Sequence, residues 1–180
     1  MLHNKGYRIR LAGDEDIDFI TDLRLSQRVQ SSVGVFLFTN TANQKEWLQR
    51  VSKSSNEKFM IFELFEDISK SYKKIGMVRF SNIDFVNRSV CVGGDIAEIF
   101  EGKGHGKAMY ETIFKVGFDV WGMNRMWLSV LENNERAIAL YKKMGFIDEG
   151  VQREAIYKDD KYLNYINMSV LRNEYNLTKR

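Results

Sequence analysis

Alternating apolar and polar positions predict seven strands, and apolar positions repeating every three to four residues predict four helices. The strands cover residues 7–12, 58–66, 74–85, 87–96 and 124–132, and two more lie within 151–171 around a turn at Asp159-Asp160. The helices cover residues 13–30, with a cap at Asp14, and 40–54, 106–121 and 134–146, while apolar residues 31–38 read as a loop or short strand. A strand–helix–strand unit implies parallel pairing and the hairpins pair antiparallel. We therefore expect an α/β (α+β) fold whose mixed, mostly antiparallel central sheet has six or seven strands and about four flanking helices.

Composition narrows the class of protein. The 180 residues are 44% apolar and 28% charged with a net charge of +3, which is typical of one soluble domain spanning residues 1–180. The mild positive charge suits an anionic small ligand, and no Lys/Arg run indicates nucleic-acid binding. Cys91, a single cysteine, excludes an internal disulfide. With neither a signal peptide nor a membrane span visible, we expect a cytoplasmic protein.

A glycine-rich stretch precedes the third predicted helix. Gly102, Gly104 and Gly106 alternate, and Lys103 and Lys107 follow two of them. Glycines permit backbone conformations that side chains forbid and let a ligand approach the main chain. The first N–H groups of a helix have no internal partner and attract anions. This stretch predicts a pyrophosphate site, with an ordinary glycine-rich turn as the alternative.

Two known phosphate motifs do not fit this stretch. A P-loop needs glycine at position 101 and Ser or Thr at 108, where the chain has Glu101 and Ala108. The dinucleotide fingerprint needs a glycine at position 107, which is Lys107. A dinucleotide oxidoreductase therefore stays only an alternative.

A second pattern, "NERAIALYKKMGF", occupies residues 134–146. Asn134 and Tyr141 are seven residues apart, which is two helical turns, so they share one helix face. A tyrosine there offers a phenol to a leaving group, and the alternative is a half-buried packing residue.

Together these patterns resemble the GNAT superfamily of acetyl-CoA-dependent N-acetyltransferases, in the branch of ribosomal-protein, polyamine and amino-sugar acetyltransferases. The family loop [RQ]-x-x-G-x-[GA] corresponds to "EGKGHG", and N-x-x-A-x-x-[LI]-Y-x-x-x-G-F corresponds to residues 134–146. "VGGDI" and "EGVQREAIYKDDKY" also look similar to the family, so the resemblance runs from about Gly76 to Leu171. Glu101 stands where the family has Arg or Gln, and we expect its side chain to turn to solvent.

The resemblance implies a site for acetyl-CoA. The strand before the glycine loop splays from the next strand, and the pantetheine arm enters the gap. Residues 76–171 form this cofactor-binding core with the C-terminal hairpin, and residues 7–75 shape the acceptor site. The implied cofactor residues are the backbone of Asp95, Ile96 and Ala97 for the arm, Gly102, Lys103, Gly104, His105, Gly106 and Lys107 for the pyrophosphate, and Asn134 for the arm. Tyr141 is the implied general acid near the sulfur, and it also contacts the cofactor.

The general base and the acceptor are less defined. Some relatives carry a base where this chain has Ser129, so a water chain or Glu132 is the candidate. A metal site is not expected, because the chain has only two histidines and one cysteine, and His105 reads as an exposed loop residue.

The expected acceptor is a small-molecule amine. A nucleotide-linked amino sugar comes first, because Arg24, Arg28, Arg79 and Arg153 suit a phosphate, followed by a protein N-terminus and a polyamine. Solvent-exposed ion pairing is the alternative for these arginines and is favoured for most of them. A non-catalytic CoA-binding sensor is the alternative from another class. No membrane or nucleic-acid partner is expected, and a homodimer is the candidate assembly.

Overall fold

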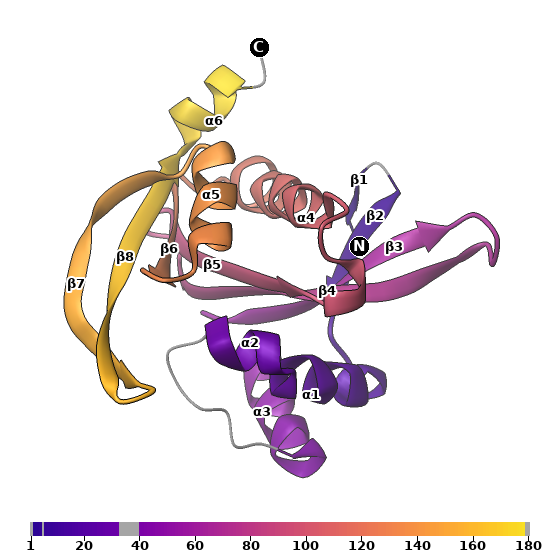
Figure 1. Cartoon of the computed structure of the whole chain (residues 1–180). Coiled ribbons are helices and arrows are strands. Elements are labelled where there is room, and N and C mark those ends of the chain that lie inside the picture. The colour runs from indigo at the N-terminus through magenta and orange to yellow at the C-terminus, as the bar shows by residue number, and fades with distance from the viewer. Residues whose placement is uncertain (1, 5, 33–39, 179–180) are drawn as a thin grey trace.

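A computed structural model describes residues 2–4, 6–32 and 40–178, with side chains described in 6–32 and 40–175 (Figure 1). Eight strands form one sheet in the order β1-β2-β3-β4-β5-β6-β8-β7. The strands are β1 (Leu2–Asn4), β2 (Tyr7–Leu11), β3 (Lys58–Glu66), β4 (Ser71–Asp84), β5 (Ser89–Ile96), β6 (Arg125–Leu131), β7 (Ile147–Lys158) and β8 (Lys161–Leu171). β5 and β6 pair in parallel and the other neighbours pair antiparallel. The predicted mixed sheet is confirmed, and the three-residue β1 adds a strand to it.

Helices cover both faces of the sheet (Figure 1). They are α1 (Ile17–Leu25), α2 (Gln27–Ser32), α3 (Thr41–Lys53), α4 (His105–Phe114), α5 (Glu135–Lys143) and α6 (Arg172–Thr178). A π-helical segment, Lys115–Val120, prolongs α4. α1, α2 and α3 lie on one side of the sheet and α4 and α5 on the other. No helix within residues 2–4, 6–32 and 40–178 is both long and apolar enough to cross a membrane.

The helix predicted over residues 13–30 is divided, and its predicted cap is wrong. The Ser26 hydroxyl and backbone N–H both bond to the carbonyl of Leu23, which ends α1 before α2 begins. Asp14 lies in a short 3-10 turn, and the Asp16 carboxylate accepts from the Gly13 N–H at 2.9 Å instead. Ser31 and Ser32 belong to α2, and the rest of the predicted segment 31–38 lies outside the described residues.

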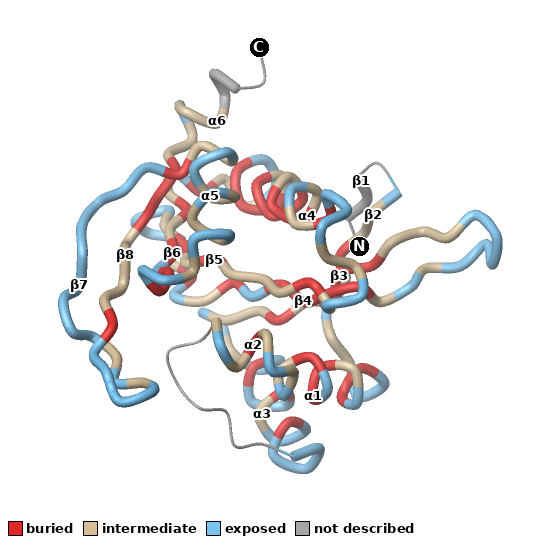
Figure 2. Tube along the Cα trace, viewed as in Figure 1, coloured by how far each residue is buried: buried red, intermediate tan, exposed pale blue. Residues whose placement is uncertain are grey.

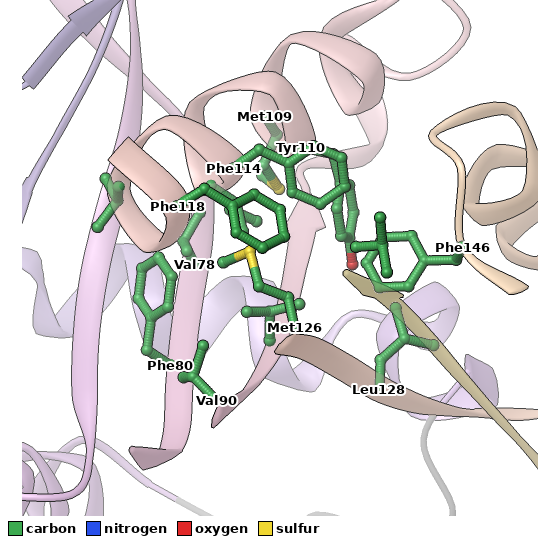
Figure 3. Packing of buried hydrophobic residues seen from close by; sticks show 14 of the residues in the cluster. Val78, Phe80, Val90, Met109, Tyr110, Phe114, Phe118, Met126, Leu128 and Phe146 are labelled. Carbon is green, nitrogen blue, oxygen red and sulfur yellow. The ribbon is translucent and has the colours of Figure 1, made fainter. Parts of the chain in front are cut away.

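Two apolar cores hold the helices to the sheet. The larger core packs α4 against one face, with Tyr110, Phe114 and Phe146 meeting above Val78 and Leu128 (Figure 3). The smaller core lies under the first three helices and is formed by Ile17, Ile20, Leu23, Val29, Leu48, Val51, Phe59, Ile61 and Met77. Successive side chains of a strand point to opposite faces, so β4 contributes Val78 to the first core and Met77 to the second.

In the C-terminal hairpin, β8 adds Met168 and Val170 to the larger core, and β7 lies outside both cores. β7 is exposed over residues 147–155 and pairs only with β8 (Figure 2). Asp159 and Asp160 have φ values of 51° and 58°, which confirms the predicted turn. The hairpin therefore extends the sheet next to β6, with β7 as the edge strand.

The sheet opens between β5 and β6. The two strands pair only from Ser89–Cys91 to Arg125–Trp127. Beyond these three pairs β5 continues to Ile96 and β6 to Leu131 without pairing with each other. This gap is the predicted splay.

Candidate active site

A cavity of about 520 Å³ lies at the gap between β5 and β6. Side chains from α1 and α2 line one side, α5 lines another, and residues of β3, β4, β7 and β8 complete it. Both the cofactor-side and the acceptor-side elements expected from the sequence therefore border one space.

Tyr141 and Asn134 both line this cavity. Asn134 precedes α5, and its Oδ1 accepts a hydrogen bond from the Ala137 N–H at 3.2 Å. This cap fixes the start of the helix and so positions Tyr141 two turns later. The Tyr141 ring packs edge-on against Tyr110, with centroids 5.2 Å apart. Burial raises the pKa of the Tyr141 phenol above its ordinary value, so the phenol carries its proton at neutral pH.

Asp95 contributes its side chain to the cavity as well as its backbone. Val90 and Val92 are buried in the larger core, so the alternation of β5 turns Asp95 toward α1 and α2. Its Oδ1 lies 3.7 Å from an Arg28 nitrogen, and 25% of the side chain is exposed. Burial raises the pKa of this carboxyl, partly offset by Arg28, Arg79 and Arg24. Sequence reasoning assigned only the backbone, although the alternation of β5 was a signal for the side chain.

Three arginines line the cavity on the same side as Asp95. Arg24 comes from α1, Arg28 from α2 and Arg79 from β4. Arg24 lies over the Trp47 ring at 4.8 Å. Burial and the charge of Arg79 lower the pKa of Arg24. The fourth arginine proposed for the acceptor, Arg153, is exposed on β7 and is not among the lining residues.

The glycine loop has the backbone geometry of an anion cradle. Gly102 and Gly104 have φ values of 74° and 83°, and no atom lies within 4 Å of a Cβ placed on either residue. Gly104 directly precedes α4. The first N–H groups of a helix have no intrahelical partner and point outward at its N-terminus, where they can bind an anion. The Lys103 ammonium donates to the Ile99 carbonyl at 3.1 Å, and Lys107 pairs with Glu111 along α4.

Glu101 is not turned to solvent, contrary to expectation. Its side chain is 14% exposed and forms ion pairs with Arg28 of α2 and Arg136 of α5. Two guanidinium groups contact one carboxylate, so the negative charge of Glu101 is neutralised beside the glycine loop. The departure from the family pattern is thus compensated by two arginines from other elements.

His105 is also placed differently from the expected exposed loop residue. It is buried at the start of α4, and its Nδ1 lies 2.8 Å from the Tyr7 hydroxyl of β2. Burial and the charge of Lys103 lower the pKa of its ring. The histidine therefore anchors the loop to β2.

Glu132 does not reach the cavity. Its carboxylate accepts hydrogen bonds from the backbone N–H and the side-chain amide of Asn164 on β8, at 2.9 and 2.8 Å. Ser129 lines the cavity and bonds to Asn167 at 2.8 Å. Within the described part of the chain, no group of three or more His, Cys, Asp or Glu side chains is arranged to hold a metal ion.

The chain is similar in sequence to curated acetyltransferases and in fold to a solved one. A putative ribosomal N-acetyltransferase of Bacillus subtilis is 23% identical over 173 residues, which are 96% of this chain and 94% of the relative. A spermidine N(1)-acetyltransferase of Vibrio cholerae is 27% identical over 110 residues, which are 61% of this chain and 62% of the relative. The crystal structure of a Vibrio cholerae spermidine N-acetyltransferase with CoA and spermine has a TM-score of 0.87 at 22% identity, covering 96% of this chain and 99% of that one. The model of the acetyltransferase (GNAT) family matches residues 27–146, and the chain belongs to that family, as its motifs predict.

Proposed function

We propose that the protein moves the acetyl group of acetyl-CoA to a primary amine by direct attack in a ternary complex. The observation that carries this proposal is the cavity in the splayed sheet, where the Tyr141 phenol and the Asp95 carboxylate border one space. The structural relative of Vibrio cholerae, which has the same fold, contains CoA together with spermine. Family membership supports the same reaction.

The residues around the gap fit acetyl-CoA as the donor. The backbone N–H groups of residues 102–107 and the start of α4 suit the pyrophosphate, since glycines leave the approach open and Lys103 adds charge. The edge of β5 at Asp95, Ile96 and Ala97 suits the pantetheine arm and the thioester carbonyl, because β5 has no β6 partner there. The free side-chain amide protons of Asn134 suit the arm from the α5 side.

Two side chains handle the protons in this proposal. An alkylammonium has a pKa of about 10 and must lose a proton before its nitrogen can attack. Asp95 takes this proton, because burial raises the pKa of its carboxyl toward the working range. The nitrogen bonds to the thioester carbon, the C–S bond breaks, and the sulfur receives the Tyr141 proton. The second proton of the nitrogen returns to the Tyr141 phenolate, so the amide is neutral and the phenol is restored. Glu132 is the less favoured base, since its carboxylate is bonded to Asn164.

The relatives bear on the acceptor. Spermidine and ribosomal acetyltransferases are among them, which supports a polyamine or a protein N-terminus over the nucleotide-linked amino sugar placed first. A polyamine acceptor is therefore the second candidate function. Residues 7–75 stay the proposed acceptor part, because Arg24 and Arg28 come from α1 and α2. A cytoplasmic location stays a prediction, and a dodecameric Vibrio cholerae relative supports self-association of some order.

Tyr141→Phe tests the proposal. It removes the proton donor and little packing, so kcat should fall by roughly 100-fold while CoA affinity stays within about twofold. Thiol release with an amine panel measures kcat, and calorimetric titration measures CoA binding. Tyr162→Phe, on the exposed hairpin, is the matched control and should change neither. An equal loss of turnover and CoA affinity contradicts the acid role, and CoA binding without turnover in the wild type favours the sensor alternative.

A further inference from the structure

We propose that the acceptor carries an anionic group, a carboxylate or a phosphate, which Arg24 and Arg79 bind while its amine faces Asp95. The proposal rests on the acetyl transfer proposed above for its place in the cavity. Among the described residues that line the cavity, three arginines and one aspartate are charged, which gives the lining a positive surplus.

The three arginines differ in how their charge is balanced. Arg28 lies between two carboxylates, those of Asp95 and Glu101. Among the residues that the structure describes, neither Arg24 nor Arg79 forms an ion pair or a hydrogen bond with a carboxylate. The uncompensated charge of the cavity therefore belongs to Arg24 and Arg79.

Each of these two guanidinium groups in the cavity lining lies against a neighbour of its own. Arg24 packs on the Trp47 ring, and a Cβ on Gly93 would lie 3.4 Å from an Arg79 nitrogen. The Arg79 side chain therefore extends across β5 beside Gly93. The charge of Arg79 also lowers the pKa of Arg24, as expected for neighbouring like charges. An anion between them relieves this repulsion.

Charged side chains of the cavity, Arg24 with Arg79 and Asp95, determine which ligand it can bind. Guanidinium groups match the paired oxygens of carboxylate and phosphate and donate charge-assisted hydrogen bonds. Asp95, on the same side of the sheet, offers the only carboxylate of the lining to an ammonium group. An amine with an anionic tail can pair its ammonium group with Asp95 and its anion with Arg24 and Arg79. The additional ammonium groups of a polyamine would lie near Arg24 and Arg79 and be repelled by them. The inference therefore separates this chain from its relatives that are named spermidine acetyltransferases.

Binding of matched amines tests the inference without requiring turnover. The full chain is saturated with CoA, which occupies the glycine loop, and is titrated calorimetrically with propylamine, β-alanine, 2-aminoethyl phosphate and spermidine. One or both anionic amines should bind at least about 10-fold more tightly than propylamine, the gain expected from charge-assisted bonds. The β-alanine and phosphate arms identify which anion the site takes.

Variants locate the effect. Arg24→Gln and Arg79→Gln should each remove most of the preference for the anionic amine, and Arg153→Gln, exposed on β7, should keep it. Arg79 is an exposed strand position, so its variant tests the site without removing core packing. Spermidine or propylamine binding as tightly as the anionic amines overturns the inference, as does an equal loss in Arg153→Gln. Thiol release from acetyl-CoA with the same amines is scored separately: an anion preference without transfer rejects the proposed function and leaves the acceptor site standing.

Discussion

At the scale of single residues, Asp95 and Tyr141 have environments that favour opposite proton tasks. Burial raises the pKa of both groups. For the carboxyl, this brings its pKa toward the range where it can accept a proton from an ammonium group. For the phenol, it keeps the proton in place until a thiolate forms nearby. The same desolvation therefore suits both groups to the roles proposed for them, Asp95 as base and Tyr141 as acid.

Asp95→Asn should reduce kcat/KM by roughly 100-fold, because the amide cannot take a proton. In the wild type, activity should fall as the pH drops through the raised pKa of Asp95, since only the ionised carboxylate is a base. The variant should lack this acidic limb in its pH–rate profile. Asp159→Asn, in the exposed hairpin turn, keeps a residue that tolerates positive φ and should keep the limb. If Asp95→Asn keeps the fall in activity at low pH, another group is responsible for that titration and Asp95 is not the base.

The sequence predicted which motif residues face the site, but it did not predict which side chains from other elements they contact. Tyr141 and Asn134 follow from helical spacing, and both line the cavity. The partners of Glu101 come from α2 and α5, so no local pattern indicates that Arg28 and Arg136 enclose it. His105 is buried for a similar reason, since Tyr7 belongs to a distant strand. Long-range pairing decides such exposures, and it depends on the completed fold.

At the scale of elements, the glycine loop joins β5 to α4 by a backbone that side chains would strain. Gly104 adopts φ 83° immediately before α4. A β-branched residue strongly disfavours this conformation. The loop therefore depends on glycine for its shape as well as for open access to its N–H groups.

Gly104→Val should weaken CoA binding by more than about 10-fold, because the side chain strains the loop and blocks the approach to its amides. Calorimetric titration with CoA measures the change. Gly6→Val is the matched control: Gly6 also has φ 83° and open space around its Cβ, but it lies between β1 and β2. Both variants should lose about 1–2 kcal/mol of stability, and only Gly104→Val should lose affinity. Equal affinity in the two folded variants removes the loop from the site.

Elements with a strong period were predicted well, and boundaries set by side-chain bonds were not. The helix at 134–146 and the turn at Asp159-Asp160 follow from local signals, and both are confirmed. Ser26 divides the first predicted helix through bonds to Leu23, which apolar spacing does not register. α6 was not predicted either. The division of the chain at residue 76 into acceptor and cofactor parts stays a prediction.

At the scale of the whole molecule, a buried charge cluster ties the first turn to two strands. Asp16 is fully buried and accepts hydrogen bonds from Arg10 of β2 at 2.7 and 2.8 Å. Lys74 of β4 lies 2.6 Å from the same carboxylate. Burial acts to raise the pKa of Asp16, but the bonds from Arg10, Gly13 and Lys74 outweigh it and lower the pKa to about 2. The ionised carboxylate therefore stabilises the fold.

Asp16→Asn should lower the free energy of unfolding by about 3 kcal/mol at pH 7, because Arg10 and Lys74 lose the ionised Asp16 carboxylate and Arg10 keeps, among the described residues, only its ion pairs with Glu63 and Glu15. The carboxyl titrates near 3.9 in the unfolded chain and near 2 in the fold, so its stabilisation is present above pH 4 and is lost as the pH falls toward 2. Urea unfolding at several pH values should show the gap between wild type and variant closing over that range. Asp14→Asn, whose exposed carboxylate lies 3.4 Å from Lys45, should cost less than about 1 kcal/mol. A gap that is constant with pH excludes titration of Asp16 as the cause.

The sheet consists of two panels, β1–β5 and β6–β8, and their shared boundary holds only three residue pairs, Ser89–Cys91 with Arg125–Trp127. After Cys91 on β5 and Trp127 on β6, the two strands form no further residue pairs with each other. A ligand bound between the two panels contacts both of them and stabilises the folded state. At 100 times its dissociation constant, such a ligand adds about 2.7 kcal/mol to the free energy of unfolding. The place proposed for acetyl transfer is thus also a place where few main-chain bonds join the two parts of the sheet.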